Sequence, residues 1–572
     1  MAEEFRLGVA VLLIKNDGPA IAHARELEES LRRVVVDFTI DRQHNSFPQI
    51  GISFFFQSFS TKDPISQRRK RLVCTIPPPN GATRTWSCNG EPIDVATWSP
   101  SGQLPYIACS ERETPEEVFG AFVADAAGKD GHRFVETSGS NLTDCDARLL
   151  IISAHGSSGS RIWMEKQSLR QLAADAAVPD AELYVDEVDG FVELEQGNLV
   201  DLVASAARNS QKQIVSKDVA GQLSALEETS AGGIDGVHFD QEDIVFSLDK
   251  ATFSSFSSSQ KVYGATSGQR ARLGIPAMRR EIQDGNPAGF DLIVLQACAL
   301  GTIEAAYELR PVAGAVIGSP TQLSGAVDLA QLVSSIDLSV WGDRPRTEAI
   351  PYMLGKSLIR IERVWRGDAL DAPYHHPASE AGLWRVAPQT SSKQDSSLHM
   401  RSLPAHHIPL VFVASNGVLP EIVELFRKIC SWVLKELRQG NHGLRDLLTT
   451  LSDNCNLRGN CERRTVDFAF LLEHLLNDES MRSGEQKQEA DRQIGNLYRA
   501  LFLYRRLIQC DDIYAPWWGT QQCNARGLAI VLPNVPMTMT ESYSTNDRTN
   551  LAFLRETKWA GVLKELGLLV EE

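Results

Sequence analysis

Short, almost wholly apolar runs, each followed by a turn or a helical pattern, constrain the fold of this chain more than any other feature. They are LGVAVLLIK (7–15), IGISFFFQSF (50–59), LLIISAHG (149–156) and LIVLQACALG (292–301). Such runs are typical of strands buried on both faces. Helical spacing follows the first run, and Thr114, Pro115 and Glu117 form the start signal of a helix before the third. The alternation predicts an α/β fold with a mostly parallel sheet and helices on both faces.

The remaining chain divides by composition. A helix (TIEAAYELRP) and a strand (VAGAVIGSP) follow the fourth run, and from about residue 400 the pattern becomes helical, with a late strand in RGLAIVLPN and a terminal helix in NLAFLRETKWAGVLKEL. Acidic clusters and a Ser-rich stretch mark an insertion with a mobile loop. We therefore predict a first core part at 1–159, an insertion at 160–272, a second core part at 273–345 and a mainly helical C-terminal region at 346–572.

Charge and composition exclude some partners and favour one compartment. The net charge of −16 argues against nucleic acid or an anionic membrane as the main partner, and no apolar run is long enough to span a bilayer. The basic run Arg68-Arg69-Lys70-Arg71 is read as a solvated hairpin face. The N-terminus lacks the pattern of a secretory signal, and the ten cysteines form no CxxC pair. A cytoplasmic protein with mostly reduced thiols is expected.

Two of the apolar runs end in the residue types that make a nucleophile and its base. His155 follows one run and Cys298 the other, and ligands of parallel sheets sit at the carboxyl ends of the strands. An imidazole can take the thiol proton and return it to a leaving amine, while the N–H groups of Gly156 and Cys298 can form an oxyanion hole. Either residue alone is more often structural. Because the two residues follow matching runs, a catalytic role for the pair is favoured over a structural one.

LLIISAHGSSG and DLIVLQACALGTIEAAYELRPVAGAVIGSP resemble the histidine and cysteine segments of the clostripain-like cysteine peptidases, which belong to the caspase-fold clan. The resemblance extends over most of the chain, except for 160–270 and about 340–400. It implies a caspase-like fold, Cys298 as nucleophile, His155 as acid/base and a protein or peptide substrate. A non-catalytic binding or scaffold protein on the same fold is the alternative.

The residue two positions before the cysteine departs from that family. Its basic-specific members have an aspartate there, in the pocket for the side chain before the scissile bond (P1), whereas this chain has Gln296. Gln296 is thus expected to belong to the substrate pocket, and acidic, neutral and basic P1 residues all stay open.

The resemblance also implies a zymogen in a regulated cascade, including bacterial defence. Cleavage near Lys261, Arg270 or Arg272, by the chain itself or by an upstream protease, would free the substrate groove.

No cofactor is required by this chemistry, and no catalytic metal is expected. The pairs His375-His376 and His406-His407 lack nearby ligands of a metal site. Acidic residues between 180 and 195 leave a structural calcium ion open, but their spacing fits no calcium loop, and a solvated acidic face is the simpler explanation.

Overall fold

A computed structural model describes the chain in two compact units. The first comprises residues 1–164, 273–387 and 405–572, and the second comprises 165–272 and 388–404. The described residues are 5–14, 27, 29–34, 50–59, 69–76, 87–88, 91–92, 106–107, 115–129, 141–157, 161–163, 167–168, 183–186, 191–194, 272–297, 300–320, 325–327, 329–334, 336, 346–358, 384–386, 411–414, 417–454, 465–481, 487–510, 527–533, 537–538 and 551–570.

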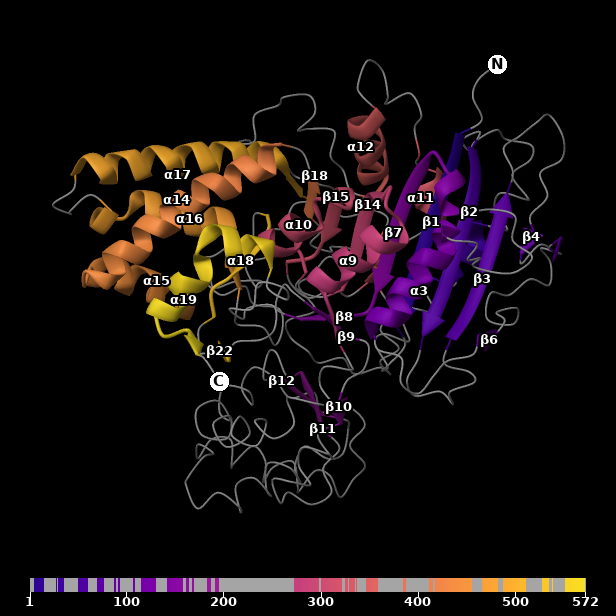
Figure 1. Cartoon of the computed structure of the whole chain (residues 1–572), viewed down its shortest axis with the longest axis horizontal. Helices are drawn as coiled ribbons and strands as arrows, with labels where there is room; N and C mark the ends of the chain where they lie inside the picture. The colour runs from indigo at the N-terminus through magenta and orange to yellow at the C-terminus, as the bar shows by residue number, and fades with distance from the viewer. Residues whose placement is uncertain are drawn as a thin grey trace. The chain divides into compact units, whose positions relative to one another are not determined.

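The first unit contains the main sheet and the helices around it (Figure 1). Its strands are β1 (Phe5–Ile14), β2 (Ile50–Phe59), β3 (Arg69–Ile76), β4 (Ser87–Cys88), β5 (Glu91–Pro92), β6 (Tyr106–Ile107), β7 (Ala147–Ser153), β8 (His155–Ser157), β9 (Arg161–Trp163), β13 (Arg272–Gly274), β14 (Phe290–Gln296), β15 (Ala313–Gly318), β16 (Gly325–Val327), β17 (Trp384–Val386), β18 (Val411–Ala414), β19 (Thr465–Asp467), β20 (Ile508–Cys510), β21 (Ala529–Val531), β22 (Met537–Thr538) and β23 (Leu569–Val570). Its helices are α3 (Pro115–Ala127), η4 (Leu142–Asp144), α9 (Ile275–Gly285), α10 (Ile303–Leu309), α11 (Leu329–Ser334), α12 (Arg346–Leu358), α14 (Val418–Arg438), α15 (His442–Asn454), α16 (Phe468–Asn477), η9 (Glu479–Met481), α17 (Lys487–Leu507), α18 (Ala552–Thr557) and α19 (Trp559–Glu565).

The main sheet has eleven strands and a parallel centre. Its order is β20-β18-β15-β14-β7-β1-β2-β3-β4-β5, with β6 paired to β3. The strands β2, β1, β7, β14 and β15 run parallel to their neighbours within this group, whereas β18 and β3 are antiparallel to it. All five parallel strands therefore end at one edge, which we call the carboxyl edge. The strand order reverses direction at β1, which is where open sheets of this type leave a crevice.

Helices cover both faces of the sheet, because the side chains of its central strands are apolar on both sides. On β7, Leu150 and Ile152 belong to one core with α3, α9 and α10. Leu149 and Ile151 belong to a second core with α11 and α12. Buried side chains of α14, α16 and α17 extend the first core. The predicted class, a mostly parallel sheet with helices on both faces, is confirmed.

The second unit contributes only short described strands. These are β10 (Gln167–Ser168), β11 (Leu183–Asp186) and β12 (Phe191–Leu194), which form an antiparallel sheet in the order β10-β11-β12. The predicted insertion at 160–272 falls mostly outside the described residues, and the domain boundaries stay predictions.

The basic run on β3 differs from the sequence-based expectation. Arg69 and Arg71 are buried rather than solvated. The Arg71 Nε donates to the Oε1 of Gln57 on β2 at 2.5 Å, and its Nη1 donates to Asp125 on α3. The run was misread because a side chain with a partner on each of two neighbouring elements can be buried even when it is charged.

The expected terminal helix also differs. It is broken into α18 and α19 at Lys558, which adopts a left-handed conformation with φ of 63°. Helix α14 ends at Arg438, Gln439 is its C-cap, and Gly440 follows with a left-handed φ of 84°. Within the described part of the chain, no helix has the length and apolarity that a membrane crossing would need.

Candidate functional site

The register of the sheet brings the ends of two central strands level with each other. β7 and β14 are parallel neighbours, and Ser153, the last residue of β7, is the register partner of Gln296, the last residue of β14. The Ala154 N–H then donates to the Gln296 carbonyl at 3.2 Å. His155 and Cys298 each follow this pair by two residues. Two residues span roughly 7 Å at most, so both residues leave the carboxyl edge from adjacent strands.

The predicted catalytic residues differ in how much of each the structure describes. His155 and Gly156 lie in β8, which pairs antiparallel with β9 so that His155 opposes Trp163 and Gly156 opposes Ile162. The side chain of His155 and the whole of Cys298 lie outside the described residues. Gln296 is described in full and is buried. The register thus places two chain segments side by side, and the dyad and oxyanion hole stay predictions.

Both ends of the Gln296 amide bond to other parts of the protein. Its Nε2 donates to the Ser153 Oγ at 2.9 Å, and its Oε1 accepts from the backbone N–H of Val327, the last residue of β16, at 3.0 Å. Ser153 and Val327 are also buried. Because all three residues are buried, a substrate side chain could reach this amide only by opening the packing around them.

The backbone just after Cys298 approaches the end of β15 too closely for any side chain. The Gly301 N–H donates to the Ser319 carbonyl at 2.6 Å. A Cβ on Gly301 would lie 2.5 Å from both the Pro320 nitrogen and the Ser319 carbonyl carbon. Only glycine fits where two backbones meet at this distance. Gln296 and Gly301, the described residues that flank Cys298 in the sequence, are therefore each held by close contacts.

The late strand β21 binds the same segment from the C-terminal part of the chain. The Ala529 N–H donates to the Gly301 carbonyl at 2.9 Å. The fully buried Glu304 on α10 accepts from the Val531 N–H at 2.9 Å. Thr302 caps α10, since its side chain accepts from the Ala305 N–H. Residues separated by more than two hundred positions in the sequence thus hold the start of α10.

Among the other described cysteines, Cys74, Cys145 and Cys430 lack the properties of an activated nucleophile. Cys74 is disulfide-bonded, whereas Cys145 and Cys430 are free. Burial, reinforced by the charge of Asp144, raises the pKa of Cys145 to about 12, and burial raises the pKa of Cys430 well above its ordinary value. A thiol reacts as its thiolate, so these two are expected to be inert at neutral pH.

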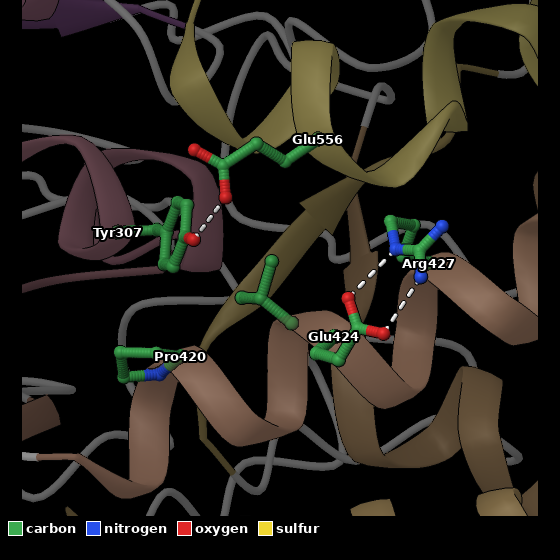
Figure 2. Close-up of a pocket in the computed structure, with 6 residues that line it drawn as sticks. Tyr307, Pro420, Glu424, Arg427 and Glu556 are labelled. Carbon is green, nitrogen blue, oxygen red and sulfur yellow. Dashed lines mark hydrogen bonds and ion pairs between the residues drawn. The ribbon is translucent and has the colours of Figure 1, made fainter.

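A small hollow of about 150 Å³ lies elsewhere, between α10, α14 and α18 (Figure 2). It is lined by Tyr307, Pro420, Val423, Glu424, Arg427 and Glu556. The polar groups bond one another: the Tyr307 hydroxyl donates to Glu556, and the Arg427 guanidinium makes two bonds of 2.7 Å to Glu424. No predicted site residue lines this hollow.

Among the described residues, no group of three or more metal-ligating side chains is brought together. The histidine pairs at 375–376 and 406–407 lie outside those residues, as do the side chains of the acidic run considered for calcium.

Comparisons with known proteins add a likeness in fold. No protein-family model matches the chain, and no curated protein matches its sequence. A solved structure of a secreted C11 cysteine protease from Bacteroides thetaiotaomicron, in complex with an irreversible peptide inhibitor, aligns with a TM-score of 0.42 and 11% identity, covering 97% of this chain and 99% of that one. An inactive zymogen C11 protease from Parabacteroides distasonis aligns with a TM-score of 0.39 and 11% identity, covering 98% and 97%.

C11 proteases are the clostripain-like peptidases that the sequence resembles, and these alignments extend over nearly the whole chain. At this identity and these TM-scores it carries no argument about chemistry, which must rest on this chain's own residues.

Sequence reasoning named Gln296 as a site residue but missed its partner Ser153 and the other residues that support the site. Ser153 and Gln296 are each the first polar residue after an apolar run, and that shared position was the available signal. The contributions of Val327, Ala529 and Val531 had no signal, because backbone N–H groups are the same in every sequence except at proline.

Proposed function

We propose that this chain is a cysteine endopeptidase that cleaves protein or peptide substrates with Cys298 as nucleophile and His155 as general acid and base. The observation that supports this most is the pairing of Ser153 with Gln296 in adjacent parallel strands. The strands that precede His155 and Cys298 in the sequence therefore end at the same edge of the sheet and at the same level. Dyad chemistry needs this proximity, which sequence spacing alone does not provide.

The proposed reaction proceeds in two steps. His155 takes the Cys298 proton, the thiolate attacks the scissile carbonyl carbon, and the oxyanion accepts from the N–H groups of Gly156 and Cys298. His155 then returns the proton to the leaving amine, which leaves a thioester on Cys298. A water molecule, deprotonated by His155, hydrolyses the thioester and restores the thiol.

The test is cleavage of a fluorogenic peptide library, varied at P1, by the purified full-length protein before and after limited proteolysis. Cys298→Ala and His155→Ala should each abolish measurable cleavage, since the residual rate without a dyad residue is smaller by several orders of magnitude. Cys145→Ala is the matched control, because it removes a described thiol of raised pKa and should leave cleavage unchanged.

The alternative, a non-catalytic binding protein, makes the opposite prediction. In that case no form of the protein cleaves any peptide, and a peptide-based thiol-reactive probe labels Cys298 no faster than Cys145. Both findings together, with folded protein tested before and after limited proteolysis, would rule out the peptidase.

We also propose that the enzyme is made as a zymogen. β13, where the chain leaves the insertion, belongs to one small sheet with β9 and β8, and β8 contains His155. Cleavage near Arg270 would free the chain directly before this strand, cleavage after Arg272 would fall at the first residue of the strand, and Lys261 is the third candidate. Replacing all three by alanine should prevent nicking and keep peptidase activity low. Unchanged activation of that variant would contradict the proposal.

A place in a regulated cascade, with an upstream protease as activator and bacterial defence as one setting, is part of the same proposal. If the Cys298→Ala protein, which cannot process itself, is nicked at one of these three sites in a host extract, an upstream protease exists.

The compartment can be settled by the oxidation state of Cys74. The cytoplasmic location expected from the sequence stays a proposal, and the disulfide bond of Cys74 counts against it, because such bonds persist mainly in oxidising compartments. Alkylation of the protein immediately on lysis, followed by peptide mass spectrometry, should find Cys74 oxidised if it matures outside the cytoplasm. A fully reduced Cys74 would favour the cytoplasm.

A further inference from the structure

Gln296 ends β14 in a buried position where the orientation of its amide is fixed by its partners. The Val327 backbone N–H can only donate, so the amide oxygen must face it, and the amide nitrogen faces the Ser153 Oγ. The Val327 nitrogen lies 3.0 Å from the amide oxygen, and the Ser153 Oγ lies 2.9 Å from the amide nitrogen. The exposed fraction of Gln296 is 0%. Both polar ends of the amide are satisfied within the chain.

These two bonds join three segments that meet at the carboxyl edge. Ser153 lies two residues before His155, Gln296 lies two residues before Cys298, and Val327 lies in β16, which follows β15. The β16 segment is fixed a second time, because the Leu329 N–H donates to the buried Ser30 Oγ. One side chain therefore links the ends of the two strands that lead to His155 and Cys298 and ties a third segment beside them.

We infer that Gln296 is a positioning residue that holds the two proposed catalytic segments in register, and that it does not read the P1 side chain. This inference rests on the proposed function. Because Gln296 is 0% exposed and its two partners are also buried, a substrate group could bond to this amide only by opening the packing around all three residues, and that cost opposes binding. P1 selectivity is then decided by residues other than the one that replaces the family's aspartate.

The variants that test this are Gln296→Met, which keeps the size of the side chain but removes both bonds, and Ser153→Ala, which removes one partner. Each should lower kcat/KM by about 10- to 100-fold for every substrate, mainly through kcat, because small displacements of reacting groups cost this much. The order of preference among P1 residues should not change. The double variant should lose little more than the worse single variant, since both act on one contact.

Asn286→Ala is the matched control. Asn286 is also a buried amide on the approach to β14, but it lies at the opposite end of the strand, where its Nδ2 donates to the Gly289 carbonyl at 2.9 Å. It should lower the melting temperature without lowering kcat. Equal losses of kcat in Asn286→Ala and Gln296→Met would mean that general destabilisation explains the effect.

Gln296→Glu distinguishes a positioning role of this residue from direct contact with the P1 side chain of the substrate. A carboxylate in direct contact with P1 would create a preference for Arg or Lys, whereas a positioning residue gives no such change. A new preference for basic P1 residues, or a changed order of preference in Gln296→Met with Ser153→Ala unaffected, would overturn the inference.

Hydrogen exchange at the Val327 amide tests the contact without any reference to activity. Gln296→Met should speed exchange at Val327 by at least about tenfold, while Asn286→Ala should not. If the wild-type protein cleaved nothing, the proposed function would fail while faster exchange still demonstrated the contact. Unchanged exchange at Val327 would overturn the positioning role in either case.

Discussion

The carboxyl edge and the hollow beside α10 use polar side chains in opposite ways. At the carboxyl edge, Gln296 and Glu304 are fully buried and bond to backbone groups of distant segments. At the hollow, Glu424 and Arg427 lie three residues apart on one helix, and their side chains are 47% and 42% exposed. The Glu424–Arg427 pair at the hollow thus joins neighbours in the sequence at the surface, whereas the edge joins remote segments in the interior. The bond from Tyr307 to Glu556 at the hollow also joins remote segments.

The difference shows where this fold requires accuracy. A buried side chain that bonds a remote backbone group fixes the position of both segments, and its loss leaves an unsatisfied group. An exposed ion pair within one helix contributes little and fixes nothing beyond its own turn. Substitutions should therefore have large effects at the edge and small effects at the hollow.

The largest effect is expected for Gly301→Ala. The new methyl group would lie 2.5 Å from backbone atoms of Ser319 and Pro320, which cannot turn aside as a side chain can. We expect a loss of more than about 3 kcal/mol in the free energy of unfolding and at least about a 100-fold loss of peptidase activity. Chemical denaturation and peptide cleavage measure these.

Gly417→Ala is the control, since a Cβ at Gly417 would meet nothing within 4 Å. Similar losses in the two variants would show that the edge is no tighter than the surface.

Glu304→Ala should have the second largest effect. It removes the acceptor of the Val531 N–H in the interior, which costs about 1–3 kcal/mol in unfolding free energy. Glu304→Gln keeps an acceptor oxygen and should recover at least half of that loss. If glutamine were no better than alanine, the bond to Val531 would not be what makes this position sensitive.

Tyr307→Phe should change the response to alkaline pH. Burial and the hydrogen bond to Glu556 raise the pKa of Tyr307 above its ordinary value of 10.0. Above pH 10 the unfolded chain loses this proton while the folded chain retains it, so stability falls as the pH rises, by up to about 1.4 kcal/mol per pH unit. The variant should show a shallower fall above pH 10 in urea titrations. Parallel curves would mean that Tyr307 ionises freely.

Glu424→Ala should have the smallest effect, less than about 1 kcal/mol, because its partner Arg427 is exposed and water screens the pair. The hydrogen bond from Arg427 lowers the pKa of Glu424 below 4.5, so this contribution is present above pH 4.5 and is lost as the pH falls further. Thermal unfolding at pH 7 and pH 3 measures it. A loss as large as that of Glu304→Ala would remove the contrast between the two regions.

The sequence predicted the main elements because their signals are local. The apolar runs at β1, β2, β7 and β14 and the start of α3 at Pro115 appear in the structure as expected. The misreadings occurred where distant contacts overrule local pattern. Arg71 is buried because its guanidinium donates hydrogen bonds to Gln57 and Asp125. Lys558 breaks a continuous helical pattern between α18 and α19.

By itself the sequence determined the class of fold and the two residues that are candidates for catalysis, because hydrophobic periodicity and side-chain chemistry are properties of short segments. Only the tertiary structure decided that Ser153 and Gln296 are partners, that Gly301 lies against Ser319, and that β21 binds the start of α10. These contacts depend on strand order and register. They are set by the packing of the whole core, and a single segment does not contain that information.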